Sequence, residues 1–285
     1  MTTAHRRGEH GAAAQHVPIE TRNPDPETRW YISGPILHRS DIDPGAFASQ
    51  RFQDDPRPVS LGGAADPDAG LFALLARLDD PAERAAVFRD YALAAAWLHE
   101  PPERRPALAE RERRGFPAVL RGWAVDSNGA SGAVLKGWAE SRFGLRVLHH
   151  GGRLADPEQD DRYAGSRRRG AAGGLLDQLD LLYRFTQVEL ARRHPGERWT
   201  TLYRGSHDPE AYMVKEGDGT LVEFNAVSSF TADRETAWEF GSRVWVVRVP
   251  LAKIVCCSGL LPGLLAGEQE HIVLGGDYRV GTLRW

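Results

Sequence analysis

The segment Tyr203-Arg204-Gly205 closes a run of strand-forming residues and places a cation where that strand should end. A guanidinium group offers parallel N–H donors that match two oxygens of a phosphate or a carboxylate. Arg204 is thus placed to clamp a phosphate or a carboxylate, with Tyr203 and Gly205 beside it. A surface arginine that merely ends a strand is the alternative.

The segment Ser229-Phe230-Thr231 leaves a second predicted strand and leads into a short helix over about 233–240. In an extended chain Ser229 and Thr231 point to one face and Phe230 to the other. Thr231 is a suitable N-cap for the helix, and Gly241 lies just beyond the helix end. Phe230 either stacks on an aromatic ligand or packs in the core.

The segment Glu268-Gln269-Glu270 precedes a short apolar strand that ends at Gly275-Gly276. In an extended chain the two carboxylates point to the same side. Such a pair suits a site where a cation sits or develops during a reaction. A solvent-exposed acidic turn after Gly267 is the alternative.

Several common sites are absent from the sequence. It contains no G-x-G-x-x-G or G-x-x-x-x-G-K-[ST] phosphate loop, no H-E-x-x-H pair and no G-x-S-x-G elbow. His149-His150 adjoin glycines in a predicted loop, where we expect a surface role rather than metal ligation. The adjacent Cys256 and Cys257 are expected to be reduced and to act as small apolar residues in a strand.

Taken in order, the three segments resemble the arginine–serine–glutamate pattern of the arginine-specific ADP-ribosyltransferases. The spacer ADRETAWEFG is similar to the helix that follows the serine segment in that family. The stretch from Trp123 to Leu145 and the end GEQEHIVLGGDYRV resemble one branch, the NAD–dinitrogen-reductase ADP-D-ribosyltransferases of nitrogen-fixing bacteria. The likeness runs from about Leu61 to the C-terminus, apart from residues 151–174.

The resemblance implies a mono-ADP-ribosyltransferase that uses NAD as its substrate and needs no metal. It implies one target arginine on the nitrogenase iron protein, dinitrogenase reductase, whose inactivation is reversible, and control by PII-type signalling proteins. The alternatives on the same fold are an NAD glycohydrolase and a transferase for a different protein. A non-catalytic NAD-sensing or scaffold protein is a further alternative, which the intact arginine, serine and glutamates argue against.

The expected catalytic residues are Glu270, Glu268 and Ser229. When nicotinamide departs from NAD it leaves a ribose cation, which the enzyme must stabilise. We expect Glu270 to bind the ribose 2′-hydroxyl and stabilise that cation, and Ser229 to hold Glu270. Glu268 should orient the target guanidinium and accept its proton, because a free arginine is a poor nucleophile.

The expected NAD-binding residues are Arg204, which should hold the pyrophosphate, with Tyr203, Gly205, Phe230 and Thr231 around it.

Helices must come first and strands last to position these segments. Apolar residues at helical spacing predict helices over about 71–78, 81–98, 106–122, 131–143 and 175–193, with Gly144 as a C-cap. Strand formers gather at 199–203, 221–224, 244–249, 254–257 and 272–274. This order predicts an α+β fold, with a mixed or antiparallel ADP-ribosyltransferase-like sheet in the C-terminal half.

We expect a flexible tail over 1–28 and a mainly helical region over 29–174 that shapes target and regulator binding. Its segment 29–68 looks irregular, and 151–174 looks like a mobile loop. Residues 175–285 should form the NAD-binding core. Within the helical region, Lys136 and the turn Asp126–Gly129 are either a surface lysine with a plain turn or contacts to NAD or the target.

Composition excludes other classes of protein. The 285 residues carry a net charge of −3, without the basic excess typical of nucleic-acid binders. No apolar run reaches the roughly 18 residues of a membrane-spanning helix. The N-terminus lacks the apolar region of a secretory signal, so we expect a cytoplasmic protein.

Overall fold

The computed structural model describes residues 39–62, 66–98, 100–154, 157–170, 174–207, 213–215 and 220–283. The expected tail over 1–28 lies outside the described residues. Within them the chain is helical first and forms a sheet last, so the α+β prediction is confirmed. No described helix is long and apolar enough to cross a membrane.

Helices make up the described part of the chain before the sheet. They are α1 Pro44–Ala48, α2 Gln50–Asp54, α3 Ala69–Leu75, α4 Pro81–Ala95, η1 Pro102–Arg104, α5 Leu108–Arg114, α6 Phe116–Val125, α7 Ala130–Phe143, α8 Pro157–Gly170 and α9 Leu175–Arg193. Gly144 ends α7 with a left-handed φ of 65°, as predicted.

Three expectations about this half are wrong in detail. The helix predicted over 106–122 is two helices, α5 and α6, that meet at Gly115, where a Cβ would lie 2.8 Å from the Arg111 carbonyl. The stretch predicted as a mobile loop contains α8, whose face toward α7 carries the buried Tyr163. The stretch predicted as irregular contains the short helices α1 and α2.

The sheet is antiparallel in every described pairing. Its strands are β1 Trp199–Ser206, β2 Met213–Lys215, β3 Thr220–Thr231, β4 Arg243–Pro250, β5 Ile254–Cys257 and β6 Glu270–Leu283, with α10 Arg234–Glu239 between β3 and β4 and η3 Leu251–Lys253 before β5. The order is β2-β3-β1-β4-β6-β5, and β3 also pairs with β6. Strands β3, β1, β4 and β6 therefore form a closed circuit of pairings.

A β-bulge bends strands β3 and β6 where they pair within this closed circuit. The register of their pairing shifts between Phe224 and Val227, opposite Gly275 and Gly276. A Cβ on Gly275 would lie 1.9 Å from the Asn225 carbonyl oxygen, so only glycine allows the backbones to approach this closely. The bulge therefore explains the glycine pair at the end of the predicted 272–274 strand, and β6 itself runs on to Leu283.

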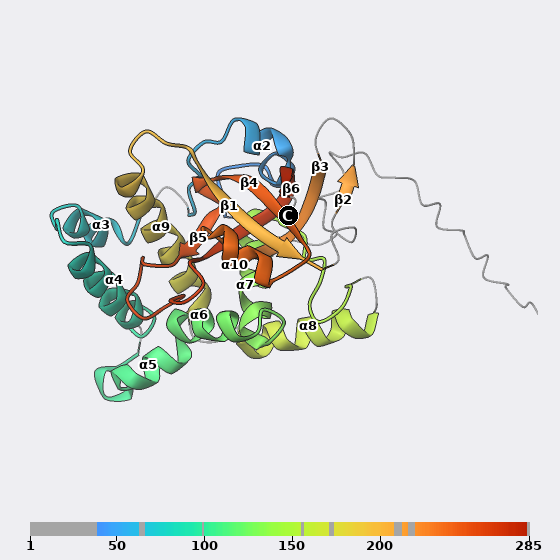
Figure 1. Cartoon of the computed structure of the whole chain (residues 1–285). Coiled ribbons are helices and arrows are strands. Elements are labelled where there is room, and N and C mark those ends of the chain that lie inside the picture. The colour runs from blue at the N-terminus through green and yellow to red at the C-terminus, as the bar shows by residue number, and fades with distance from the viewer. Residues whose placement is uncertain are drawn as a thin grey trace, which may run out of the picture.

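The helices pack around this sheet and share one continuous core with it. Figure 1 shows α2 on the opposite side of the sheet from α7 and α8, with α3, α4 and α5 at the outer edge. Helix α9 packs against β5, α7 against β3, and α10 against β1. Stacked Phe88 and Phe185, with ring centroids 4.1 Å apart, and the buried Arg84–Glu189 ion pair join α4 to α9.

Candidate active site

A cavity of about 590 Å³ brings together the residues that the sequence analysis selected from three separate strands. Its walls come from β1, β3, α10, the turn before β6, α6, the α6–α7 turn, α7 and the loop after it. The predicted residues in its lining are Tyr203, Arg204, Gly205, Ser229, Phe230, Thr231, Glu268 and Glu270. All eight of the predicted site residues therefore face one cavity.

Glu270 is buried at the start of β6 and Ser229 holds it from β3. The Ser229 Oγ donates to Glu270 Oε1 over 2.5 Å. In the β3–β6 register Thr231 is opposite Glu270 and Ser229 is opposite Ile272, so Ser229 and Glu270 are diagonal neighbours on one face. The expected Ser229–Glu270 contact is therefore a consequence of strand register.

A tryptophan from the helical half reaches the same carboxylate. The Trp123 indole N–H, from α6, lies 2.8 Å from Glu270 Oε1 and 3.1 Å from Ser229 Oγ. In this half of the chain the sequence pointed to Lys136 and the turn Asp126–Gly129 as alternative contacts to NAD or the target, and Trp123 was missed. The signal that the sequence offered is that the stretch resembling the family branch, Trp123 to Leu145, begins at this residue.

Glu268 reaches the cavity by a different route from the one expected. Glu268 and Gln269 belong to a turn rather than an extended strand, and Gln269 has a left-handed φ of 47°. The premise of two carboxylates along one strand edge is therefore wrong. Both still line the cavity, with Glu268 exposed and Glu270 only 7% exposed. The turn thus gives the two carboxylates different environments.

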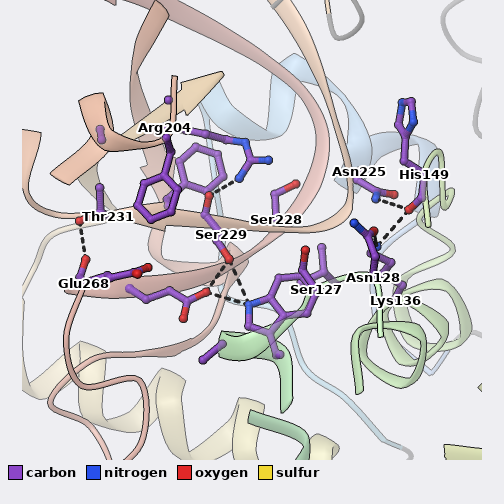
Figure 2. A pocket seen from close by; sticks show the side chains of 18 of the residues that line it. Ser127, Asn128, Lys136, His149, Arg204, Asn225, Ser228, Ser229, Thr231 and Glu268 are labelled. Carbon is purple, nitrogen blue, oxygen red and sulfur yellow. Dashed lines mark hydrogen bonds between the residues drawn. The ribbon is translucent and has the colours of Figure 1, made fainter. Parts of the chain in front are cut away.

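Arg204 lies at the end of β1, over the serine segment. Its Nη1 donates to the Ser229 carbonyl, and its guanidinium carbon is 5.8 Å from the centroid of the Phe230 ring. These two contacts orient the fork in the cavity wall (Figure 2).

The neighbours of Arg204 have mainly structural contacts. A Cβ on Gly205 would lie 2.0 Å from the Ala237 carbonyl, so this glycine lets α10 pack against β1. Phe230 is 3% exposed and packs edge-on against Phe224, with ring centroids 5.0 Å apart. Phe230 is therefore a core residue that also lines the cavity.

The sequence suggested Thr231 as the N-cap of α10, but Thr231 does not cap this helix. The cap is Asp233, whose carboxylate accepts from the Glu235 and Thr236 N–H groups. Thr231 Oγ1 instead donates to the Glu268 carbonyl over 2.7 Å and accepts from the Asp233 N–H. Thr231 therefore fixes the turn that carries Glu268.

The opposite wall is polar and combines residues of the helical half with Asn225 of β3. Lys136 is 2% exposed, and its Nζ donates to Asn128 Oδ1 over 3.1 Å and to the His149 carbonyl over 3.0 Å. Asn225, at the β3 bulge, donates to the same carbonyl over 2.8 Å. Burial lowers the pKa of Lys136 to about 8, although the Asp126 carboxylate opposes that shift. Lys136 is thus a buried cation, not a helix-surface lysine.

Figure 2 shows Asn225, His149, Asn128 and Lys136 on one side of the cavity, and Thr231 and Glu268 on the other. The expected surface position is wrong for His150, which is 5% exposed, whereas His149 is half-buried and lines the cavity. Cys256 and Cys257 are free and buried in β5, and burial raises the pKa of both thiols. Among the described residues no group of three potential ligands could hold a metal ion.

A second cavity of about 870 Å³ lies among α3, α4 and α9. None of the predicted site residues lines it, so the smaller cavity is the candidate active site.

A sequence model of the family described as dinitrogenase reductase ADP-ribosyltransferase matches residues 37–282. The chain is also similar to the NAD(+)–dinitrogen-reductase ADP-D-ribosyltransferase of Rhodospirillum rubrum. The two are 35% identical over 253 residues, which cover 82% of this chain and 90% of the relative. No solved structure shows significant similarity.

Proposed function

The chain belongs to the dinitrogenase reductase ADP-ribosyltransferase family, and we propose that its cavity transfers ADP-ribose from NAD to an arginine of dinitrogenase reductase, the nitrogenase iron protein. The observation that carries this proposal is the pair of carboxylates in one cavity. Glu270 is buried and held by donors, whereas Glu268 is exposed at the turn. Glu270 can therefore bind the ribose of NAD while Glu268 contacts the arginine of the target protein.

NAD binding follows from the size and charge of the cavity. Its volume lies within the roughly 300–1,000 Å³ of sites for small molecules. Arg204 is the cation nearest the serine segment, and its fork suits two pyrophosphate oxygens. Tyr203, Gly205, Phe230 and Thr231 form the wall around it. The polar wall at Asn128 and Lys136 is then available to the adenosine half of the dinucleotide.

The first chemical event is cleavage of the bond between the ribose C1′ and the nicotinamide nitrogen. The bonding electron pair passes to that nitrogen, so nicotinamide leaves neutral and C1′ takes on positive charge. The Glu270 carboxylate stabilises this charge and accepts a hydrogen bond from the ribose 2′-hydroxyl. The Ser229 donor and the burial of Glu270 hold the carboxylate where the charge develops.

The second event is attack on C1′ by a guanidinium nitrogen of the target. The new C1′–N bond forms as that nitrogen gives up a proton. Glu268 pairs with the guanidinium and accepts the proton, which then passes to solvent because Glu268 is exposed. An acid at this position is what favours arginine as the acceptor over water.

The helical half is proposed to shape the surface that meets the target and its regulators, including a PII-type signalling protein. Reversal of the modification requires a separate hydrolase. A cytoplasmic location is part of the same proposal, and the free thiols of Cys256 and Cys257 fit a reducing compartment.

The proposal is tested by incubating the purified chain with labelled NAD and purified nitrogenase iron protein. We expect label on a single iron-protein arginine, and loss of both label and nicotinamide release in Glu270→Gln. Nicotinamide release without labelled protein would instead identify an NAD glycohydrolase. Neither product from the wild-type chain would favour the non-catalytic alternative.

A further inference from the structure

The hydrogen bonds around Glu270 converge on one of its two oxygens. Ser229 Oγ and the Trp123 indole N–H both bind Oε1, at 2.5 Å and 2.8 Å. The indole nitrogen is also 3.1 Å from Ser229 Oγ, so the three groups form a closed triangle. Because these two donors bind Oε1, Oε2 is the oxygen they leave for the ribose hydroxyl.

The chemistry of an indole suits this position. An indole N–H only donates and exchanges no proton with a carboxylate, so it stabilises the charged form without competing for the proton. Bonds from a donor to an ionised acceptor are about twice as strong as neutral ones. Burial makes such a donor necessary, because a charge removed from water must be compensated by hydrogen bonds.

The helix that carries Trp123 is itself held firmly. Its first N–H, from Phe116, donates to Gln178 Oε1 of α9 over 2.9 Å. Gly122 lets α6 approach α7 closely, since a Cβ there would lie 2.2 Å from Ser131 Oγ. Trp123 is 2% exposed, so its ring has little freedom to turn away from Glu270.

We propose that Trp123 is a positioning residue for ADP-ribosyl transfer, which fixes the Glu270 carboxylate from the helical half of the chain. This inference rests on the proposed role of Glu270. It also makes α6 part of the catalytic architecture, because the residues that follow Trp123 (Ala124, Val125, Ser127 and Asn128) line the same cavity.

The test is Trp123→Phe, which keeps an aromatic ring and removes the N–H donor. The matched control is Trp138→Phe in α7, where a fully buried indole donates to Asp180 Oδ1 over 2.7 Å outside the cavity lining. Both variants lose one N–H···carboxylate bond, so both should lose comparable thermal stability. Only Trp123→Phe should lower kcat, by roughly 10- to 100-fold, with the KM for NAD unchanged.

Equal kcat values in the two variants would overturn the proposal, and so would a Trp123→Phe defect confined to KM. If Trp123→Phe does not fold, benzothienylalanine at position 123 supplies the same test, because it keeps the bicyclic ring and replaces only the N–H by sulfur. Glu270→Gln measured alongside separates the two hypotheses. If Glu270→Gln keeps the wild-type kcat, the proposed function is refuted. If Glu270→Gln loses activity while Trp123→Phe keeps the wild-type kcat, only the role of Trp123 is refuted.

Discussion

Removing the Ser229 hydroxyl should slow the chemical step without weakening NAD binding. Ser229→Ala deletes a 2.5 Å hydrogen bond to the buried side-chain carboxylate of Glu270. Such bonds contribute about 1.5–3 kcal/mol. The Trp123 N–H, which is shared between Ser229 and Glu270, then becomes wholly available to Glu270 and offsets part of the loss. We therefore expect about 1.5–2 kcal/mol, which is roughly a 10- to 30-fold lower kcat.

The assay is nicotinamide release at saturating NAD, together with the KM for NAD and a thermal melt. The matched control is Thr186→Val, which removes a buried hydroxyl of α9 that donates to the Leu182 and Val255 carbonyls. The control should lose stability and keep kcat. A Ser229→Ala enzyme within twofold of wild type would refute the positioning role of this hydroxyl, as would a change seen only in KM.

Two further predictions concern ligand binding and pH. Arg204→Ala should raise the KM for NAD about tenfold or more and change kcat little, because a charge-assisted bond to the pyrophosphate is lost. Initial rates measured over a range of NAD concentrations check this prediction. An unchanged KM would place the pyrophosphate elsewhere. Lys253 is fully buried, and burial lowers its pKa to about 7 from 10.5. Between those values the unfolded chain binds more protons than the folded chain, so the free energy of unfolding should rise with pH across that window. Urea unfolding at several pH values should show a flatter rise in Lys253→Met, and an identical slope would contradict the assignment.

The sequence predicts best what depends on neighbouring residues. Gly144 marks the end of α7 because a left-handed C-cap is a local requirement, and α9 is recognisable from its own amphipathic pattern. The strand segments of Arg204 and Ser229 are visible from their composition. Their convergence on one cavity was predicted from family resemblance, since no local rule shows that β1 and β6 both pair with β3.

What the sequence could not predict depends on distant contacts. Trp123 and Glu270 are separated by 147 positions, and nothing local distinguishes this indole from any other core tryptophan. The sequence around Lys136 is typical of a helix-surface lysine, but in the fold this side chain is buried and donates to the His149 carbonyl. Helix α8 is polar and glycine-bearing, which resembles a loop, yet its packing against α7 compensates for poor propensity.

The turn before β6 illustrates the same limit at short range. Alternation predicts an extended Glu268-Gln269-Glu270, whereas the hydrogen bond from Thr231 to the Glu268 carbonyl holds Glu268 outside the strand. The left-handed φ of Gln269 is unusual for a residue other than glycine and is held by this tertiary contact. Family resemblance thus placed both carboxylates in the site, whereas local alternation predicted the wrong backbone conformation for Glu268 and Gln269.

The central claim is that Glu270 stabilises the ribose cation and Glu268 activates the target arginine. It is tested most directly by whether Glu268→Gln transfers ADP-ribose to arginine or to water. The measurement is the ratio of labelled iron protein to nicotinamide released, with wild-type chain as the reference. Glu268 is exposed, so the substitution should leave folding and NAD cleavage intact. We predict that the wild type places nearly one label on an arginine for each nicotinamide, and that Glu268→Gln releases nicotinamide with little label. A Glu268→Gln enzyme that labels the iron protein at the wild-type ratio would contradict the account.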